Sequence, residues 1–175
     1  MATIFQTILI LVSLSGGDNF PLLNKHSKKI DKVISSIWPE INTEVEGLYS
    51  ESSDLKDVGV IGHIELHKVL SASDTAYVYV SQARSKVDDF DFLVVYNSDL
   101  NIQAVKVLQY RENHGGEISS KRFLRQFVGL SGNSNMKYGK DIDGISGATI
   151  SVRAITAGIK RMSMNMTKLE SNKML

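Results

Sequence analysis

Residues 20–38 carry apolar side chains at helical spacing, with lysines between them. Leu22, Ile30 and Ile34 fall on one side of a helix, and the lysines fall on the other. Such a stripe is typical of an amphipathic helix that covers a core. Pro39 then ends the pattern, because the residue before a proline disfavours helical backbone. The sequence therefore predicts one helix near the start of the chain.

The middle of the chain shows the alternation and the β-branched residues of strands, after a polar loop over residues 40–57 with one short segment around residues 45–49. The third predicted strand is apolar almost throughout, which indicates a strand buried on both faces. A turn signal separates it from the fourth, so we expect these two to form an antiparallel hairpin. The predicted strands are residues 58–70, 75–80, 90–96 and 102–110.

Two helices are predicted after the strands. Residues 119–128 form a short one, capped by Ser119 or Ser120 and ended at Gly129. A loop rich in Gly, Asn, Ser and Asp leads to a last helix over residues 145–165, with a polar tail that we expect to fray. Consecutive strands flanked by helices favour an α+β fold. We expect a single domain, with a mainly antiparallel sheet on which the N-terminal helix and the C-terminal helices pack.

Composition narrows the possible functions. The chain has 175 residues, which fits one domain, and 42% of them are apolar. Its 20 basic and 19 acidic residues give a net charge of +1, which argues against a nucleic-acid partner. There is no cysteine, which excludes disulfides, thiolate metal sites and cysteine nucleophiles.

An apolar run over residues 4–14 is too short to span a membrane but has the length of a signal-peptide core. Small residues follow, and Gly16-Gly17-Asp18 resembles a processing boundary, although no basic residue precedes the run. The alternative is a buried first strand, because the run is rich in β-formers. We expect residues 1–17 to be a signal peptide or apolar segment, and residues 18–175 to be an extracytoplasmic or periplasmic domain that can associate with a membrane.

The segment Asp143-Gly-Ile-Ser146-Gly147-Ala148-Thr149 is a loop that enters the last helix. Either Ser146 or Asp143 could cap the first turn. The free N–H groups and the helix dipole would favour an anion such as a phosphate, with the Thr149 hydroxyl beside it. The plainer alternative is a capped helix with small residues for packing.

This segment resembles the flavinylation motif of the FMN-binding domain family, which includes flavinylated subunits of the sodium-pumping NADH:quinone oxidoreductase and of the Rnf electron-transport complex. The resemblance extends upstream through Arg111-Glu-Asn-His-Gly-Gly-Glu-Ile118 and Phe123-Leu-Arg-Gln-Phe127-Val-Gly129, and is clearest over residues 77–160. The turn that reads Glu-Thr-x-Gly in many members is Asn113-His114-Gly115-Gly116 here, so no flavin contact is carried over to it.

The resemblance implies that Thr149 carries FMN through a phosphoester bond, within the stretch Ser146, Gly147 and Ala148. It also implies a dedicated flavin transferase that uses FAD and magnesium, for which Asp143 would be a recognition element. Membrane redox proteins would then be the electron donors or acceptors. The alternatives are a ligand-binding or assembly module without flavin, and a flavin-dependent reductase.

Further residues are candidates by their charge or their rings. Lys140 and Arg153 flank the motif and could balance a phosphate, or could be solvated surface charges. The rings of Tyr138, Phe127 and Tyr110 are possible neighbours of the flavin, with core packing the expected role of Phe127.

His63, Glu65 and His67 alternate on a predicted strand and would share one face. Three such side chains could hold a metal ion. The favoured interpretation is a polar face turned to solvent.

Overall fold

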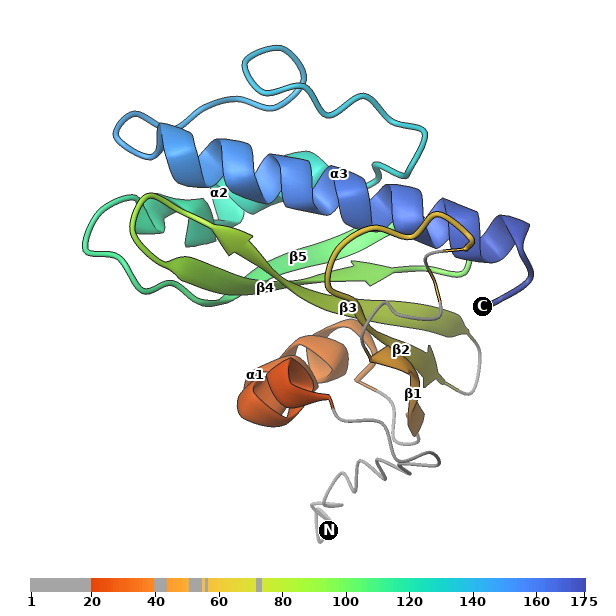
Figure 1. The fold of residues 1–175 in the computed structure, drawn as a ribbon. Helices are drawn as coiled ribbons and strands as arrows, with labels where there is room; N and C mark the ends of the chain where they lie inside the picture. Colours follow the sequence, from red (N-terminus) through yellow and green to blue (C-terminus); the bar gives the residue numbers. More distant parts are fainter. Residues whose placement is uncertain (1–19, 40–43, 51–54, 56, 72–73) are drawn as a thin grey trace, which may run out of the picture.

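The computed structural model describes residues 20–39, 44–50, 55, 57–71 and 74–175. A five-stranded sheet forms its middle, and each strand pairs antiparallel with the next along the chain, in the order β1-β2-β3-β4-β5 (Figure 1). The hairpin predicted between the third and fourth strands is confirmed as β4 and β5. The strands are β1 Glu44–Ser50, β2 Glu65–Leu70, β3 Thr75–Arg84, β4 Asp89–Tyr96 and β5 Ile102–Gln109.

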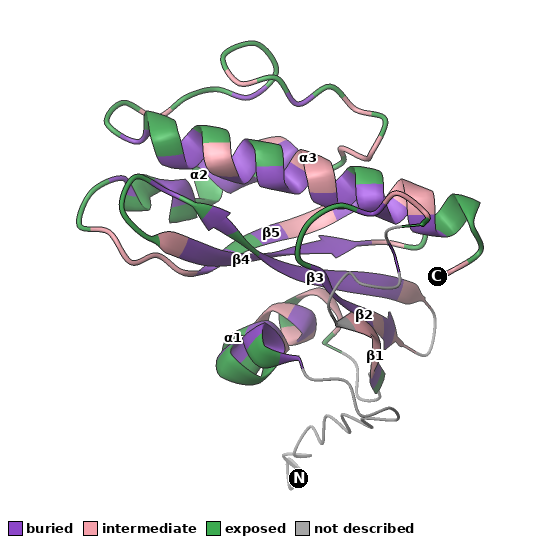
Figure 2. Ribbon diagram, viewed as in Figure 1, coloured by how far each residue is buried: buried purple, intermediate pink, exposed green. Residues whose placement is uncertain are grey.

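Two helices cover opposite faces of this sheet. Helix α1, Pro21–Ile37, lies on one face, and the long helix α3, Thr149–Ser171, crosses the other (Figure 1). Two apolar clusters result, one under each helix. Strands β3 and β4 contribute to both and are therefore buried on both faces (Figure 2). The predicted α+β fold, with one domain and a mainly antiparallel sheet, is confirmed.

Helix α3 packs closely on the sheet. A Cβ atom added to Gly158 would lie 2.9 Å from Cζ of Phe92, so the helix can approach β4 only where a side chain is missing. Between β5 and α3 lie the short helices η1 Gly116–Ser119, α2 Lys121–Leu124 and η2 Arg125–Phe127. The Ser120 hydroxyl accepts a hydrogen bond from the N–H of Phe123, which confirms one of the two predicted caps.

The predicted strand over residues 58–70 is only half present, because β2 begins at Glu65. Gly59 and Gly62 have positive φ angles and turn the preceding segment away from the sheet. This segment crosses to α3, where Asn165 accepts from the N–H of Ile61 at 3.2 Å and donates to its carbonyl at 3.0 Å. A side chain of α3 thus satisfies backbone groups that a strand partner would otherwise bind.

Helix α3 begins four residues later than predicted and continues beyond the predicted end. Its first residue is Thr149, and neither Ser146 nor Asp143 caps it, because Ala148 occupies the N-cap position and no side-chain hydrogen bond is made there. The expected frayed tail is wrong: Met166 and Leu169 are fully buried, so the sheet stabilises this part of the helix. Among the described residues, none of the helices has the length and hydropathy of a membrane span. The predicted signal segment lies outside those residues.

Candidate functional site

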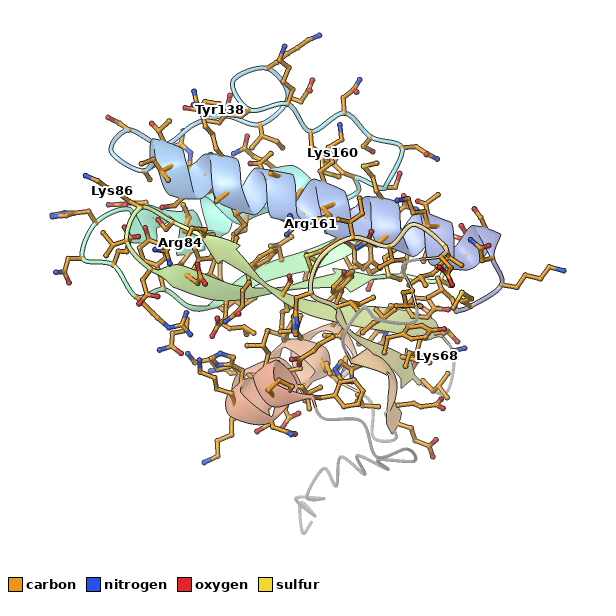
Figure 3. The ribbon with its side chains drawn as sticks, viewed as in Figure 1. Lys68, Arg84, Lys86, Tyr138, Lys160 and Arg161 are labelled. Atoms are coloured by element: carbon orange, nitrogen blue, oxygen red, sulfur yellow. The ribbon has the colours of Figure 1, made fainter. Side chains whose placement is uncertain are left out.

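A cleft of about 710 Å³ opens beside the first turn of α3. Three segments far apart in the sequence line it: the β3–β4 turn at residues 85–88, the stretch after β5 at residues 111–114, and residues 147–151. Lys86, on the turn, lies at the end of the molecule where α3 begins (Figure 3). The cleft is therefore a product of the tertiary fold.

Thr149 is exposed on the rim of this cleft as the first residue of α3. Gly147 adopts a φ of +81°, which lets the loop turn sharply into the helix. The N–H groups of the first helical turn have no partner within the helix, and no acidic side chain lies in that turn. This combination of free N–H groups and positive dipole end suits an anion next to the Thr149 hydroxyl.

Three hydroxyl groups hold the segments of the cleft together. The oxygen of Ser151 lies 2.8 Å from the hydroxyl of Tyr110 and 2.6 Å from that of Ser85. Tyr110 donates its proton to the carbonyl of His114 at 2.8 Å. It follows that Ser151 donates to Tyr110 and Ser85 donates to Ser151. This chain of hydrogen bonds fixes the first turn of α3 against the β3–β4 turn and the end of β5.

The β3–β4 turn is held a second time, by Glu112. Its carboxylate accepts from the N–H of Val87 at 2.7 Å and from that of Asp88 at 3.2 Å. The bond from Val87 is the main reason why the pKa of Glu112 lies below its ordinary value. Glu112 therefore stays ionised and keeps the turn folded over the cleft.

The positive charge of Arg111, which lines the cleft, is already balanced. Its guanidinium donates to both carboxylate oxygens of Asp91, which is fully buried. Lys86 has no ion pair among the described residues. Lys86 is therefore the cation of the cleft that remains available to a ligand.

Two apolar side chains face solvent at the cleft. Val87 on the β3–β4 turn is 70% exposed and Ile150 on α3 is 50% exposed, and both line the cavity. Large apolar side chains exposed at the mouth of a cleft are typical of ligand sites.

The other residues predicted from the motif are divided, because Gly147 and Ala148 line this cleft and Asp143 and Ser146 do not. Asp143 is exposed, its N–H donates to Gln126 at 2.7 Å, and it lines a separate hollow of about 380 Å³ beside α2. Ser146 is exposed and lines neither hollow. Neither Lys140 nor Arg153 lines the cleft.

None of the three candidate rings lines the cleft, although the Tyr110 hydroxyl is hydrogen-bonded to Ser151, which does. The guanidinium of Arg153 lies 5.0 Å from the ring centre of Tyr138, in the loop over α3 (Figure 3). Phe127 is fully buried against Phe123, in the expected core role.

The predicted polar face of β2 is wrong, because Glu65 and His67 are buried beneath α1. The two oxygens of Glu65 accept from the N–H groups of Leu22 and Leu23, both at 2.9 Å. Within the described residues, no group of three side chains is arranged to hold a metal ion. The open start of α1 thus explains the buried carboxylate of Glu65.

Comparison with known families and structures supports the resemblance. Residues 86–163 match the family described as the FMN-binding domain. Residues 86–163 of this chain are thus similar to FMN-binding domains. A similar structure is that of one subunit, designated C, of the Na⁺-translocating NADH-quinone reductase from Parabacteroides distasonis. The TM-score is 0.52, with 15% identity over 85% of this chain and 95% of that chain. No curated protein sequence matches significantly.

The matched stretch, residues 86–163, encloses every residue that lines the cleft except Ser85. Sequence reasoning missed Lys86 and Val87, and it gave Glu112 no role although Glu112 lies in the upstream stretch that resembles the family. No motif marks Lys86 and Val87, because they reach the site only through the pairing of β3 with β4. Ser151 could have been predicted from the sequence, because it follows Thr149 on the same turn of the predicted helix.

Proposed function

We propose that this protein is an electron carrier whose FMN is attached by a phosphoester bond to the hydroxyl of Thr149. The observation that carries the proposal is the position of that hydroxyl, exposed at the start of α3 on the rim of the cleft. A transferring enzyme can reach it there, and the helix N-terminus suits the phosphate that would be bonded to it.

The attachment is a group transfer without any redox change. A flavin transferase with magnesium would take FAD as donor and break its phosphoanhydride bond, so that AMP leaves. The oxygen of Thr149 forms a bond to the phosphorus of FMN, and the hydroxyl proton is released to the transferase or to water. The phosphodiester that results keeps one negative charge, which the first-turn N–H groups would meet. Asp143, exposed before the motif, is our candidate for recognition by the transferase.

The residues of the cleft fit a flat, mostly apolar ring tethered at Thr149. Val87 and Ile150 offer exposed apolar surface on two sides of the cleft, and Lys86 offers a positive charge at its edge. The bound flavin would supply the transfer of one or two electrons, while the chain supplies position and electrostatics. A covalent tether suits an open cleft, because it keeps the local concentration of flavin high without deep burial.

We further propose that the domain works outside the cytoplasm, beside a membrane, and exchanges electrons with membrane redox proteins. The support is the resemblance of the motif to flavinylated subunits of such complexes. The Parabacteroides distasonis structure shares the fold, and its own name describes an NADH-quinone reductase.

Intact mass tests the covalent linkage. The protein is co-expressed with a flavin transferase in the presence of magnesium, beside Thr149→Val, Thr149→Ser and Ser146→Ala. We expect the wild type to gain the mass of one FMN less one water, and Thr149→Val to gain nothing. Thr149→Ser keeps a hydroxyl and should retain modification, and Ser146→Ala should be modified like the wild type.

An unmodified wild type, with the transferase shown to be active on a control domain, would contradict the proposal. Modification that persists in Thr149→Val would place the linkage elsewhere. If the flavin is present, turnover with a defined acceptor would then separate a reductase from a carrier.

A further inference from the structure

A second hollow, of about 780 Å³, lies between α1, the outer edge of β5 and the short helices α2 and η2. We refer to it as the edge groove. It shares no lining residue with the cleft at the start of α3. Any ligand of the edge groove is therefore separate from the proposed flavin.

The edge groove is centred on the open side of the sheet. Ala104 and Leu108 of β5 pack with the apolar cluster under α1, whereas Val105 and Val107 belong to the cluster on the α3 face. All four line the edge groove. A hollow lined by both faces of one strand must open along the edge of that strand, where its backbone is accessible.

The backbone of β5 is paired on this outer side only near its two ends. Ile102 donates to the carbonyl of Leu130 and accepts from the N–H of Gly129, both at 2.8 Å. Near the other end, the ammonium of Lys29 donates to the carbonyl of Leu108. Within the described part of the chain, no hydrogen bond joins residues 103–107 of β5 to an element on the outer side. At roughly 3.3 Å per residue, this gap fits a short extended segment.

The charges around the edge groove are all of one sign. No carboxylate of the described residues lines it, although the chain as a whole is close to neutral. The floor carries apolar side chains, including Leu124 of α2 and Val128, which is 48% exposed. The cations that line it are Lys29, Lys32, Lys106, Lys121 and Arg125.

We propose that the edge groove binds an extended, acidic segment of a partner protein, which adds a strand to β5. The open backbone of residues 103–107 would pair with the segment, its apolar side chains would enter the floor, and its carboxylates would meet the five cations. An unpaired edge strand can form hydrogen bonds with a strand of another protein. Here the lysines around the edge groove favour a segment with negative charge.

Charge and shape exclude the competing occupants. A second copy of this chain, paired edge to edge, would bring two sets of five cations together. A lipid surface would need apolar groups that project from the protein, whereas those of the edge groove lie in a hollow between α1 and α2. A lipid surface also offers no peptide groups that could form hydrogen bonds with the open edge of β5.

The test measures binding of a fluorescent peptide in which glutamate alternates with valine. The probe is titrated against the full chain, and against Lys106→Glu/Arg125→Glu. The matched control is Lys137→Glu/Lys173→Glu, which makes the same change of net charge at exposed residues outside the edge groove. We expect saturable binding that the groove variant weakens about tenfold or more and the control leaves unchanged. Hydrogen exchange of β5 amides should slow when the peptide binds.

Three further probes decide the mode of binding. A lysine–valine peptide should not bind, and the acidic peptide N-methylated on the amides that would face β5 should bind at least tenfold more weakly. Equal binding of the N-methylated peptide would overturn strand addition. No binding of the acidic peptide, or equal loss in the control variant, would overturn the proposal. Vesicles of phosphatidylglycerol that bind through Lys106 and Arg125, when the peptide does not, would show a membrane surface instead.

Discussion

At the scale of single residues, Asp91 joins the cleft at the start of α3 to helix α1. Burial alone raises the pKa of this carboxyl, but hydrogen bonds from Arg111, Gln82, His26 and Lys25 outweigh burial and hold the pKa well below its usual range. The carboxylate therefore stays ionised inside the protein. Because Arg111 lines the cleft while His26 and Lys25 belong to α1, one buried charge couples both sides of the sheet.

We predict that Asp91→Asn lowers the free energy of unfolding by about 2–3 kcal/mol near pH 7, because the amide leaves the cations around it without their counter-charge. Urea denaturation measures this loss. A depressed pKa stabilises the fold above the unfolded value of 3.8, and that stabilisation disappears as pH falls below it. The difference between wild type and variant should therefore shrink in acid. Asp89→Asn, at a partly exposed ion pair, is the control and should change little.

A second prediction at this scale concerns the hydroxyl chain. Ser151→Ala should reduce stability by about 1 kcal/mol, since Ser85 and Tyr110 lose a buried partner. If the chain holds the first turn of α3 in place, the rate of FMN attachment should also fall although Thr149 is intact. Single-turnover flavinylation against Ser146→Ala measures the effect. An unchanged rate would show that the position of Thr149 does not depend on Ser151.

At the scale of elements, helix α1 depends on a strand for its N-terminal cap. Phe20 occupies the N-cap position and makes no side-chain hydrogen bond, and Pro21 follows it. The buried carboxylate of Glu65 on β2 supplies the missing acceptor for Leu22 and Leu23. The helix start is thus anchored to the sheet as well as capped.

We predict that Glu65→Gln destabilises the protein by about 1–2 kcal/mol, because one of the two acceptor oxygens becomes an NH2 group that cannot accept from a backbone N–H. Hydrogen exchange should accelerate at Leu22 and Leu23 first, ahead of the strands. Glu44→Gln, at an exposed position of β1, should leave exchange unchanged. Uniform acceleration over the whole protein would contradict a local cap.

At the scale of the whole molecule, His67 links stability to pH. Burial lowers the pKa of His67 to about 4, against an opposing effect of Glu65. Its ring packs against Phe20 with 4.5 Å between ring centres, and its Nε2 atom has no hydrogen-bond partner among the described residues. The folded protein therefore holds this ring neutral where the unfolded chain would protonate it.

We predict that stability falls as pH drops from about 6.5 towards 4, since over that interval only the unfolded chain gains the proton. The shift corresponds to about 3 kcal/mol. His67→Phe should flatten the profile between pH 7 and pH 4.5, whatever its effect at neutral pH. His114→Gln, exposed in the cleft, should keep the wild-type profile. A variant profile as steep as that of the wild type would assign the pH dependence to other groups.

Several parts of the molecule could be predicted because they depend on local pattern. The stripe of residues 20–38 specifies a helix, and the apolar run of β4 specifies a strand buried on both faces. The exposure of Thr149 at a helix start follows from the small residues before it. The helix boundary was less predictable, because Gly147 and Ala148 fit equally well inside a loop or a first turn.

What only the tertiary structure decided is the environment of each polar side chain. Alternation on β2 places Glu65 and His67 on one face of the sheet. Helix α1 packs on that face and buries both side chains. Likewise, the cleft joins Lys86, Glu112 and Thr149 through strand pairing that no local pattern encodes. The sequence by itself determined the type and order of most helices and strands, because backbone periodicity is local, but it did not determine their exact ends. The burial of a side chain and its hydrogen-bond partners depend on which segments pack against it. Those segments are distant in the sequence, so only the tertiary structure shows them.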